Sequence, residues 1–265
     1  MKEKKESKSN RIIVLGCGHT GTTLISGILH LNGFGFKKVS TQFEPLRLNE
    51  LTARAKKEGL TKEIKKHIEK FFKSLDKKEN KNWAVKDPKL CYWIDEIDNV
   101  IPKPYKVIFN FRKPGSTVQH LADDRVEFEG MSRKKAREDA ESHYLLKNKN
   151  VMDFLKKKSK SENKKLLYVN YDDLVDRYLV NIIDRFVRKK LNYGFIKPRK
   201  RKAKEINVSE EVQKIYARAM KNYMNNISQV VVNYETVKNT SVAERVKTWC
   251  AEQRVKVRRN IWFLD

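Results

Sequence analysis

The sequence predicts an α/β fold, in which a mainly parallel sheet carries helices on both faces. Two observations predict it. Short apolar runs alternate with longer amphipathic segments along the 265 residues. The first apolar run leads into a glycine-rich turn, residues 16–21, which opens directly into a helical pattern. Residues 1–10 are polar and charged, so we expect a disordered tail there. No internal repeat is visible, and we expect a single domain over residues 11–265.

The expected elements follow from these patterns in chain order. Strands are expected where short runs of β-branched and aromatic residues occur, at residues 11–15, 83–85, 105–111 and 166–171. Helices are expected where apolar residues recur every three to four positions, at residues 22–31, 49–79 (interrupted at 59–61), 89–100, 131–158, 173–191, 209–227 and 241–258. Residues 32–47 are expected to form a loop, and residues 197–204 a basic one. In such sheets ligands bind beyond the carboxyl ends of the strands.

The composition allows two interpretations of the net charge of +26. A basic surface could bind an acidic partner, such as nucleic acid or an anionic polymer. The lysines are instead scattered along amphipathic segments such as residues 50–79, which favours a simple compositional bias. Nucleic acid is disfavoured because the aromatic residues show no interleaved stacking pattern. An anionic carbohydrate or polymer remains the expected class of partner.

The cysteines are few and odd in number: Cys17, Cys91 and Cys250. They form neither a disulfide framework nor a C-x-x-C metal motif, so no metal site is expected. The polar N-terminal residues do not resemble a signal peptide, and no apolar run approaches 18 residues. A cytoplasmic protein without a membrane span is expected.

The glycine-rich turn within RIIVLGCGHTGTT, residues 11–23, predicts a phosphate site. Glycines let backbone N–H groups converge on an anion at the positive end of a helix dipole. The spacing fits a nucleoside-triphosphate P-loop, except that Thr22 replaces the lysine that reaches the β- and γ-phosphates. That replacement argues against a kinase or an ATPase. The turn also fits the dinucleotide pattern G-x-G-x-x-G, but residues 36–40, where that pattern requires an acid, contain none.

The segments GCGHTGTT, WAVKDPKL, VIFNFRKPGSTVQH and LLYVNYDDLVDR follow one another in this order, within residues 16–177. Together they resemble PAPS-dependent sulfotransferases, closest to the tyrosylprotein, carbohydrate and bacterial branches, and the resemblance covers residues 11–191. The resemblance implies a P-loop-type α/β domain. It also implies transfer of a sulfuryl group from 3′-phosphoadenosine 5′-phosphosulfate (PAPS) to an acceptor hydroxyl or amine, without a metal.

The resemblance assigns nucleotide-binding roles to nine residues. The 5′-phosphosulfate would be held by the turn residues Gly18, His19, Thr20, Gly21, Thr22 and Thr23. Arg112 matches the family arginine that binds the 3′-phosphate. His120 stands at the position of the second 3′-phosphate ligand, which is usually a serine. Tyr171 matches the tyrosine that contacts adenine. Structural alternatives are helix capping by the threonines, a surface ion pair for Arg112, a histidine on a helix surface for His120 and a core aromatic for Tyr171.

The resemblance also assigns catalytic roles. Glu44 in the segment FEPL matches a glutamate that would act as the general base, and Lys86 matches a lysine that would offset charge on the transferring group. Their structural alternatives are a solvated glutamate and a lysine paired with Asp87. His19 departs from the family, which has arginine or lysine at this position inside the turn. It would act as a neutral hydrogen-bond donor or become protonated beside the bound anion.

Two other functions remain open. The chain could be a catalytically idle nucleotide-binding homologue, because His19 and His120 replace the usual residues. It could also be a dinucleotide-binding oxidoreductase. Acceptor choice is expected to depend on residues 32–60 and 120–135, and the sequence does not identify the acceptor.

Overall fold

The computed structural model describes residues 10–35, 38–78, 82–162, 165–194, 196 and 206–235. These residues form one parallel four-stranded sheet in the order β2-β1-β3-β4. Its strands are β1 (Asn10–Leu15), β2 (Asn82–Lys86), β3 (Lys106–Phe111) and β4 (Leu166–Asn170). In the register, Val14 lies between Lys86 and Ile108, so the carboxyl ends of the central strands meet at one edge.

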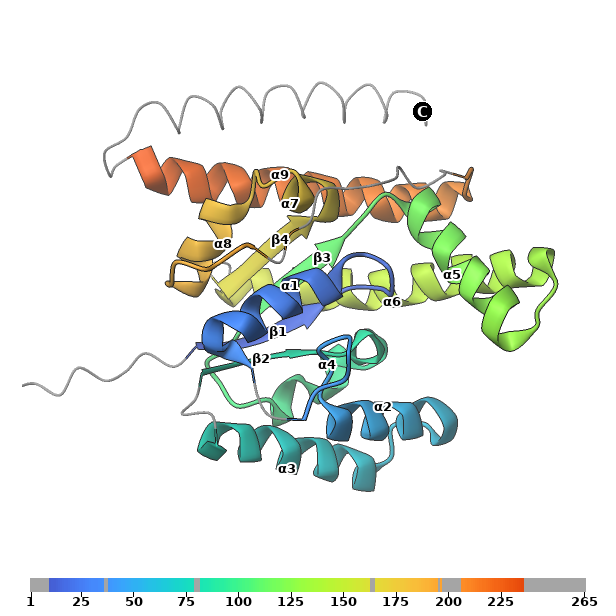
Figure 1. Cartoon of the computed structure of the whole chain (residues 1–265), viewed down its shortest axis with the longest axis horizontal. Helices are drawn as coiled ribbons and strands as arrows, with labels where there is room; N and C mark the ends of the chain where they lie inside the picture. The colour runs from blue at the N-terminus through green and yellow to red at the C-terminus, as the bar shows by residue number, and fades with distance from the viewer. Residues whose placement is uncertain are drawn as a thin grey trace, which may run out of the picture.

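The helices cover both faces and both side edges of the sheet. They are α1 (Thr22–Leu29), α2 (Leu46–Glu58), α3 (Lys62–Lys78), α4 (Ile94–Ile97), α5 (Pro114–Glu129), α6 (Arg133–Glu162), α7 (Tyr171–Val175), α8 (Val180–Val187) and α9 (Glu210–Glu235). Figure 1 shows α1 in front of the sheet, α6 behind it, α2 and α3 beyond β2, and α9 along β4. The predicted fold class is therefore confirmed.

Buried polar groups join the outer helices to the sheet. Arg11 of β1 donates two hydrogen bonds of 2.8 Å to the Asp76 carboxylate of α3, and Trp83 Nε1 donates to the same group at 3.0 Å. At the opposite edge, Asn226 of α9 accepts from the Tyr168 backbone N–H at 3.3 Å and donates to the Leu166 carbonyl at 3.1 Å. The side chain thus satisfies backbone groups of an edge strand that has no further strand beside it among the described residues.

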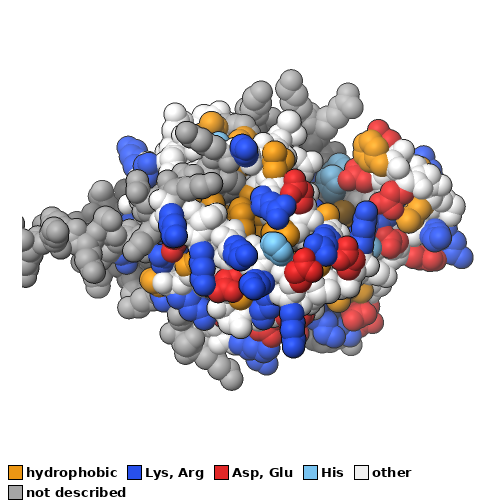
Figure 2. Space-filling view, turned by 90° about the horizontal axis from the view of Figure 1, so that it is seen from below, with side chains coloured by type: hydrophobic (Ala, Val, Ile, Leu, Met, Phe, Trp, Pro, Cys, Tyr) orange, Lys and Arg blue, Asp and Glu red, His pale blue; other side chains and the backbone are white. Residues whose placement is uncertain are grey.

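The exposed face of α2 and α3 carries many basic side chains. Figure 2 shows this face from below, with Lys and Arg spread over it and Asp and Glu among them. Several are paired within one helix turn, including Arg47–Glu50 at 3.2 Å and Lys73–Glu69 at 2.6 Å. Part of the charge on this face is therefore balanced locally.

Some element boundaries differ from the sequence expectations. Residues 89–100 form a 3-10 turn (Pro88–Tyr92), α4 and a second 3-10 turn (Asp98–Val100), because Trp93 has a non-helical backbone. The expected helix 173–191 is divided between α7 and α8, with Arg177 and Arg188 in left-handed conformations. Tyr171 begins α7 and does not end β4.

The two segments expected to select the acceptor are largely helical. α5 begins at Pro114 and continues to Glu129, so it covers residues 120–129 of the segment 120–135, and α6 begins at Arg133. A π-helical turn (His30–Phe34) follows α1, and α2 begins directly after Pro45, within the segment 32–60. Asn10, expected in the tail, belongs to β1. Residues 1–9, the basic segment 197–204 and the expected helix 241–258 lie outside the described residues.

Candidate functional site

The glycine turn joins β1 to α1 at the carboxyl edge of the sheet. Gly21 precedes the helix with φ 89°, and a Cβ atom there would lie 2.0 Å from Tyr171 Cδ2. His19 also has a positive φ, 60°. The turn therefore requires glycine at position 21 for two reasons, its backbone conformation and its contact with Tyr171. The Leu24 and Ile25 N–H groups donate to the Gly21 carbonyl at 3.0 and 3.3 Å, whereas the N–H groups of Thr22 and Thr23 precede any acceptor in the helix, which makes this end suited to an anion.

The hydroxyl residues of the turn occupy different surroundings. Thr20 is buried, and its Oγ1 donates to the Cys17 carbonyl at 2.7 Å, so this hydroxyl closes the turn internally. Thr22 is buried, whereas Thr23 is partly exposed beside Lys86. Gly18 faces Leu121 of α5. Thr23 is therefore the threonine whose hydroxyl adjoins the predicted catalytic lysine.

Lys86 and Glu44 form a buried ion pair at the end of β2. Lys86 Nζ lies 2.7 Å from Glu44 Oε1 and 3.4 Å from Thr23 Oγ1, and the Lys86 side chain is 1% exposed. Asn49 of α2 donates to the other carboxylate oxygen of Glu44. Burial lowers the pKa of Lys86, and the Glu44 charge opposes that shift. The pair places a carboxylate and an ammonium beside the start of α1.

Asp87, the neighbour of Lys86, belongs to a separate network. Its buried carboxylate accepts from the Thr52 hydroxyl of α2 and from the Lys89 backbone N–H at 2.8 Å. Successive residues of an extended strand point to opposite faces, which separates Asp87 from its neighbour. The ion pair of Lys86 with Asp87, considered as an alternative from the sequence, is therefore replaced by one with Glu44.

Arg112 follows β3 and lies against Tyr171. Its guanidinium carbon is 4.7 Å from the centre of the Tyr171 ring, and its Nη1 donates to the His19 carbonyl at 3.4 Å. Arg112 is 9% exposed, so it is not the surface residue of the structural alternative. A guanidinium stacked on an aromatic ring retains the hydrogen-bonding edge that suits phosphate oxygens.

His19 and His120 stack above the turn, with ring centres 5.5 Å apart. His19 Nε2 lies 2.7 Å from Asp124 Oδ2 of α5. Burial lowers the pKa of His120, and the nearby charges of His19 and Arg112 lower it further. The predicted site residues are thus linked through contacts that run from Glu44 by way of Lys86, Thr23 and the turn to Arg112 and His120; their roles stay predictions.

Asn49 and Asp124 were not predicted from the sequence. Asn49 lies five residues after Glu44, within reach across the start of α2. Asp124 lies four residues after His120, on the same face of α5, and this spacing was the available signal. Their contacts could not be read from the sequence because the start of α2 and the whole of α5 were expected as loops or left unassigned.

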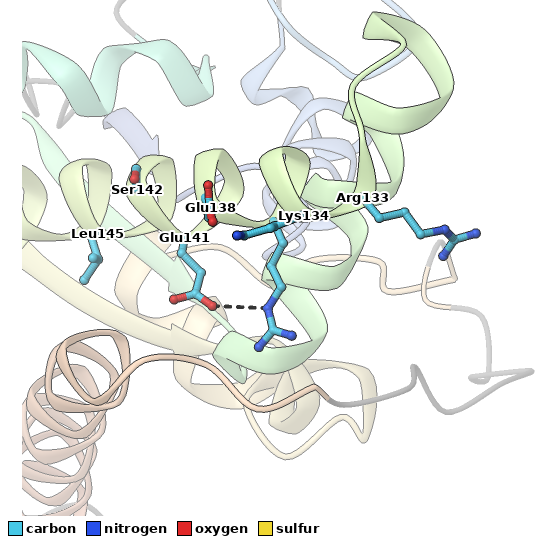
Figure 3. A pocket seen from close by; sticks show the side chains of 7 residues that line it. Arg133, Lys134, Glu138, Glu141, Ser142 and Leu145 are labelled. Carbon is cyan, nitrogen blue, oxygen red and sulfur yellow. Dashed lines mark ion pairs between the residues drawn. The ribbon is translucent and has the colours of Figure 1, made fainter.

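A separate hollow lies on α6, away from these residues. It has a volume of about 650 Å³ and is lined by Arg133, Lys134, Arg137, Glu138, Glu141, Ser142 and Leu145. Figure 3 shows the ion pair across it, between Arg137 and Glu141, with Nε 3.5 Å from Oε1. No predicted site residue is among its lining residues.

Comparison with solved structures identifies the fold. The sulfotransferase domain from the curacin biosynthetic pathway matches with a TM-score of 0.53 and 16% identity, over 91% of this chain and 96% of that one. The chain has the sulfotransferase fold. The sulfotransferase domain from the Synechococcus PCC 7002 olefin synthase matches with a TM-score of 0.53 and 15% identity, over 81% of this chain and 83% of that one. Sulfotransferase STF9 from Mycobacterium avium matches with a TM-score of 0.50 and 14% identity, over 80% of this chain and 76% of that one.

No protein-family model and no curated protein sequence matches the chain. Within the described ranges, no group of three His, Cys, Asp or Glu side chains is arranged to hold a metal ion. The helices of that same part of the chain include none that combines the length and apolar character needed to cross a membrane.

Proposed function

We propose that this sulfotransferase-fold chain moves a sulfuryl group from PAPS to an acceptor hydroxyl, with Glu44 as the general base. The observation that carries the proposal is the buried Lys86, which contacts Glu44 at 2.7 Å and Thr23 at 3.4 Å. Through these contacts the expected cation, Lys86, and the expected base, Glu44, lie at the start of α1, where the phosphate is expected to bind. The proposal explains why a carboxylate and an ammonium are buried together beside a glycine turn.

The residues of the turn suit the nucleotide. The backbone N–H groups at the start of α1, with Thr22 and Thr23, would hold the 5′-phosphosulfate. Arg112 would bind the 3′-phosphate through its guanidinium, which Tyr171 holds by stacking at 4.7 Å. Tyr171 would contact adenine with the remainder of its ring. His120, in the second turn of α5, would be the second ligand of the 3′-phosphate.

The chemistry assigned to this chain is a proton transfer and a charge offset. Glu44 would take the proton of the acceptor hydroxyl as its oxygen bonds to sulfur, while the bond from sulfur to the 5′-phosphate oxygen breaks and 3′,5′-ADP leaves. Lys86 would offset the charge that develops on the transferring group and on the leaving oxygen. Because Lys86 is 1% exposed, its charge acts with little screening by water. No metal is assigned a part in this step.

The direct test is transfer of labelled sulfate from PAPS to a panel of acceptors, in EDTA. Glu44→Gln should lower turnover by about 10²-fold or more, the usual effect of losing a general base. Lys86→Ala should also lower it. Glu50→Gln is a matched control, since Glu50 is 64% exposed and pairs with Arg47 at the surface. Normal turnover by Glu44→Gln would remove Glu44 as the base.

The second candidate is a catalytically idle nucleotide-binding homologue. It is favoured by His19, which stands in place of the family's fixed cation and is engaged with Asp124 at 2.7 Å. Binding of 3′,5′-ADP without transfer to any acceptor would support it. Binding of a nicotinamide dinucleotide that excludes 3′,5′-ADP would instead support an oxidoreductase. An anionic carbohydrate or polymer is the acceptor class that we propose to test first, because the chain is strongly basic.

A further inference from the structure

Two histidines, an arginine and a carboxylate meet beside the glycine turn. His19 comes from the turn and His120 from α5, and their rings stack at 5.5 Å with planes 29° apart. Asp124 lies one helix turn after His120, and its Oδ2 is 2.7 Å from His19 Nε2. Arg112 approaches from the end of β3 and bonds to the His19 carbonyl at 3.4 Å. The cluster therefore joins three parts of the chain that surround the predicted phosphate site.

The charged groups near the two rings have opposite effects on the protonation of His120. His19 and Arg112 act on His120 from the turn and from the end of β3, and both disfavour its charged form together with burial. Asp123 and Asp124, both on α5, favour the charged form of His120. A positive charge on His120, beside Arg112, is therefore disfavoured before an anion binds.

An anionic nucleotide would change this balance. Its phosphate groups would offset the Arg112 charge and add negative charge at the turn, so that a protonated imidazole becomes favourable. His19 Nε2 is engaged by Asp124, and its Nδ1 has no hydrogen-bond partner within the described part of the chain. That nitrogen is therefore the donor through which the ring could contact an anion.

We propose that the His19–His120 pair takes up a proton when 3′,5′-ADP or PAPS binds, and that Asp124 is a positioning residue that holds His19 for this purpose. The proposal rests on the proposed nucleotide-binding function of the same site. It places a histidine that can gain a proton at the position where sulfotransferases have a permanently charged arginine or lysine. Nucleotide affinity should then fall as pH rises, by up to about tenfold per pH unit for one proton taken up.

The test is calorimetry of 3′,5′-ADP binding to the full chain near neutral pH, in buffers of different ionisation enthalpy. The dependence of the measured heat on the buffer gives the number of protons bound. We expect uptake of about 0.5–1 proton. His19→Arg supplies a fixed charge, so it should reduce the uptake and make affinity less dependent on pH. His120→Asn should also reduce the uptake.

Asp124→Asn tests the positioning role separately. The amide cannot form the charge-assisted bond to a protonated His19, so affinity should fall most above neutral pH. Glu127→Gln is the matched control, because it removes a carboxylate from the next turn of α5 without touching either histidine. An Asp124→Asn profile that matches the Glu127→Gln profile would contradict the positioning role.

The outcomes separate this inference from the proposed function. Tight binding of 3′,5′-ADP to the wild-type chain without proton uptake would overturn the inference and leave the proposed function intact. Failure of the wild-type chain to bind 3′,5′-ADP at any pH between about 6 and 8 would overturn both. Because the wild-type proton count is measured directly, the inference remains testable even if a histidine variant fails to fold.

Discussion

The buried pair of Lys86 and Glu44 gives the sharpest stability prediction. Glu44→Gln keeps an oxygen that can accept from Asn49 but leaves the Lys86 ammonium, 1% exposed, without its counter-charge. Removing one partner of a buried pair costs about 3–5 kcal/mol. Burial already lowers the pKa of Lys86, so the lysine can release its proton in the variant. We therefore expect the free energy of unfolding to fall by an amount at the lower end of that range, about 3 kcal/mol at pH 7.

The assay is thermal and urea unfolding of a double-mutant cycle. For a chain of this size, a loss of about 3 kcal/mol lowers Tm by roughly 6–12 °C. Glu44→Gln combined with Lys86→Met removes both charges, so the double variant should be more stable than Glu44→Gln alone, by about 1–3 kcal/mol. Glu50→Gln, from a pair that is 62% and 64% exposed, should change stability by less than about 0.5 kcal/mol.

The pH dependence supplies a second check on the same variant. Without Glu44 the pKa of Lys86 should fall further, because the Glu44 charge is the largest contribution that raises it. The unfolded chain then binds a proton that the folded variant has released, so stability of the variant should rise with pH toward the ordinary lysine range. The reasoning would be refuted if Glu44→Gln and the double variant were equally stable, or if Glu44→Gln behaved like Glu50→Gln.

Three further predictions follow from single contacts. Gly21→Ala should destabilise the chain by about 1–3 kcal/mol in urea unfolding, since its φ is 89° and Tyr171 fills the space; an unchanged midpoint would contradict this. Asn226→Leu should lower Tm and speed amide exchange in β4, because the Tyr168 N–H and Leu166 carbonyl lose their partner; unchanged exchange would argue against it. Burial lowers the pKa of Lys106 to about 8, so between about pH 8 and 10 the wild type should gain stability relative to Lys106→Met; a constant difference would contradict that shift.

Local sequence carried enough information to predict the glycine turn and the strands. The turn depends on backbone freedom at Gly21, which is a property of that residue. The strands are short apolar runs buried on both sides, as β3 shows with five buried residues out of six. Such runs have few alternative structures within a parallel sheet. The fold class therefore followed from patterns a few residues long.

The partners of the site residues depended on contacts that local patterns do not contain. Lys86 pairs with Glu44, 42 residues earlier, although Asp87 is adjacent in sequence. His19 meets Asp124 across 105 residues. α5 was not expected as a whole helix because polar residues such as Ser116, Thr117 and Arg125 are buried in it, which weakens the apolar periodicity. Tertiary packing, and not local pattern, decided these features.

The most direct test of the central claim, a site for a 3′-phosphorylated adenine nucleotide, is the affinity of the wild-type chain for 3′,5′-ADP compared with 5′-AMP. Because Arg112 is 9% exposed and stacks on Tyr171 at 4.7 Å, it should recognise the 3′-phosphate strongly. Arg112→Ala should cost about 2–5 kcal/mol, which is a loss of roughly 30-fold or more in affinity for 3′,5′-ADP. Calorimetry should show clear preference for 3′,5′-ADP in the wild type and none in the variant. Equal affinity of the wild type for the two nucleotides would contradict the account.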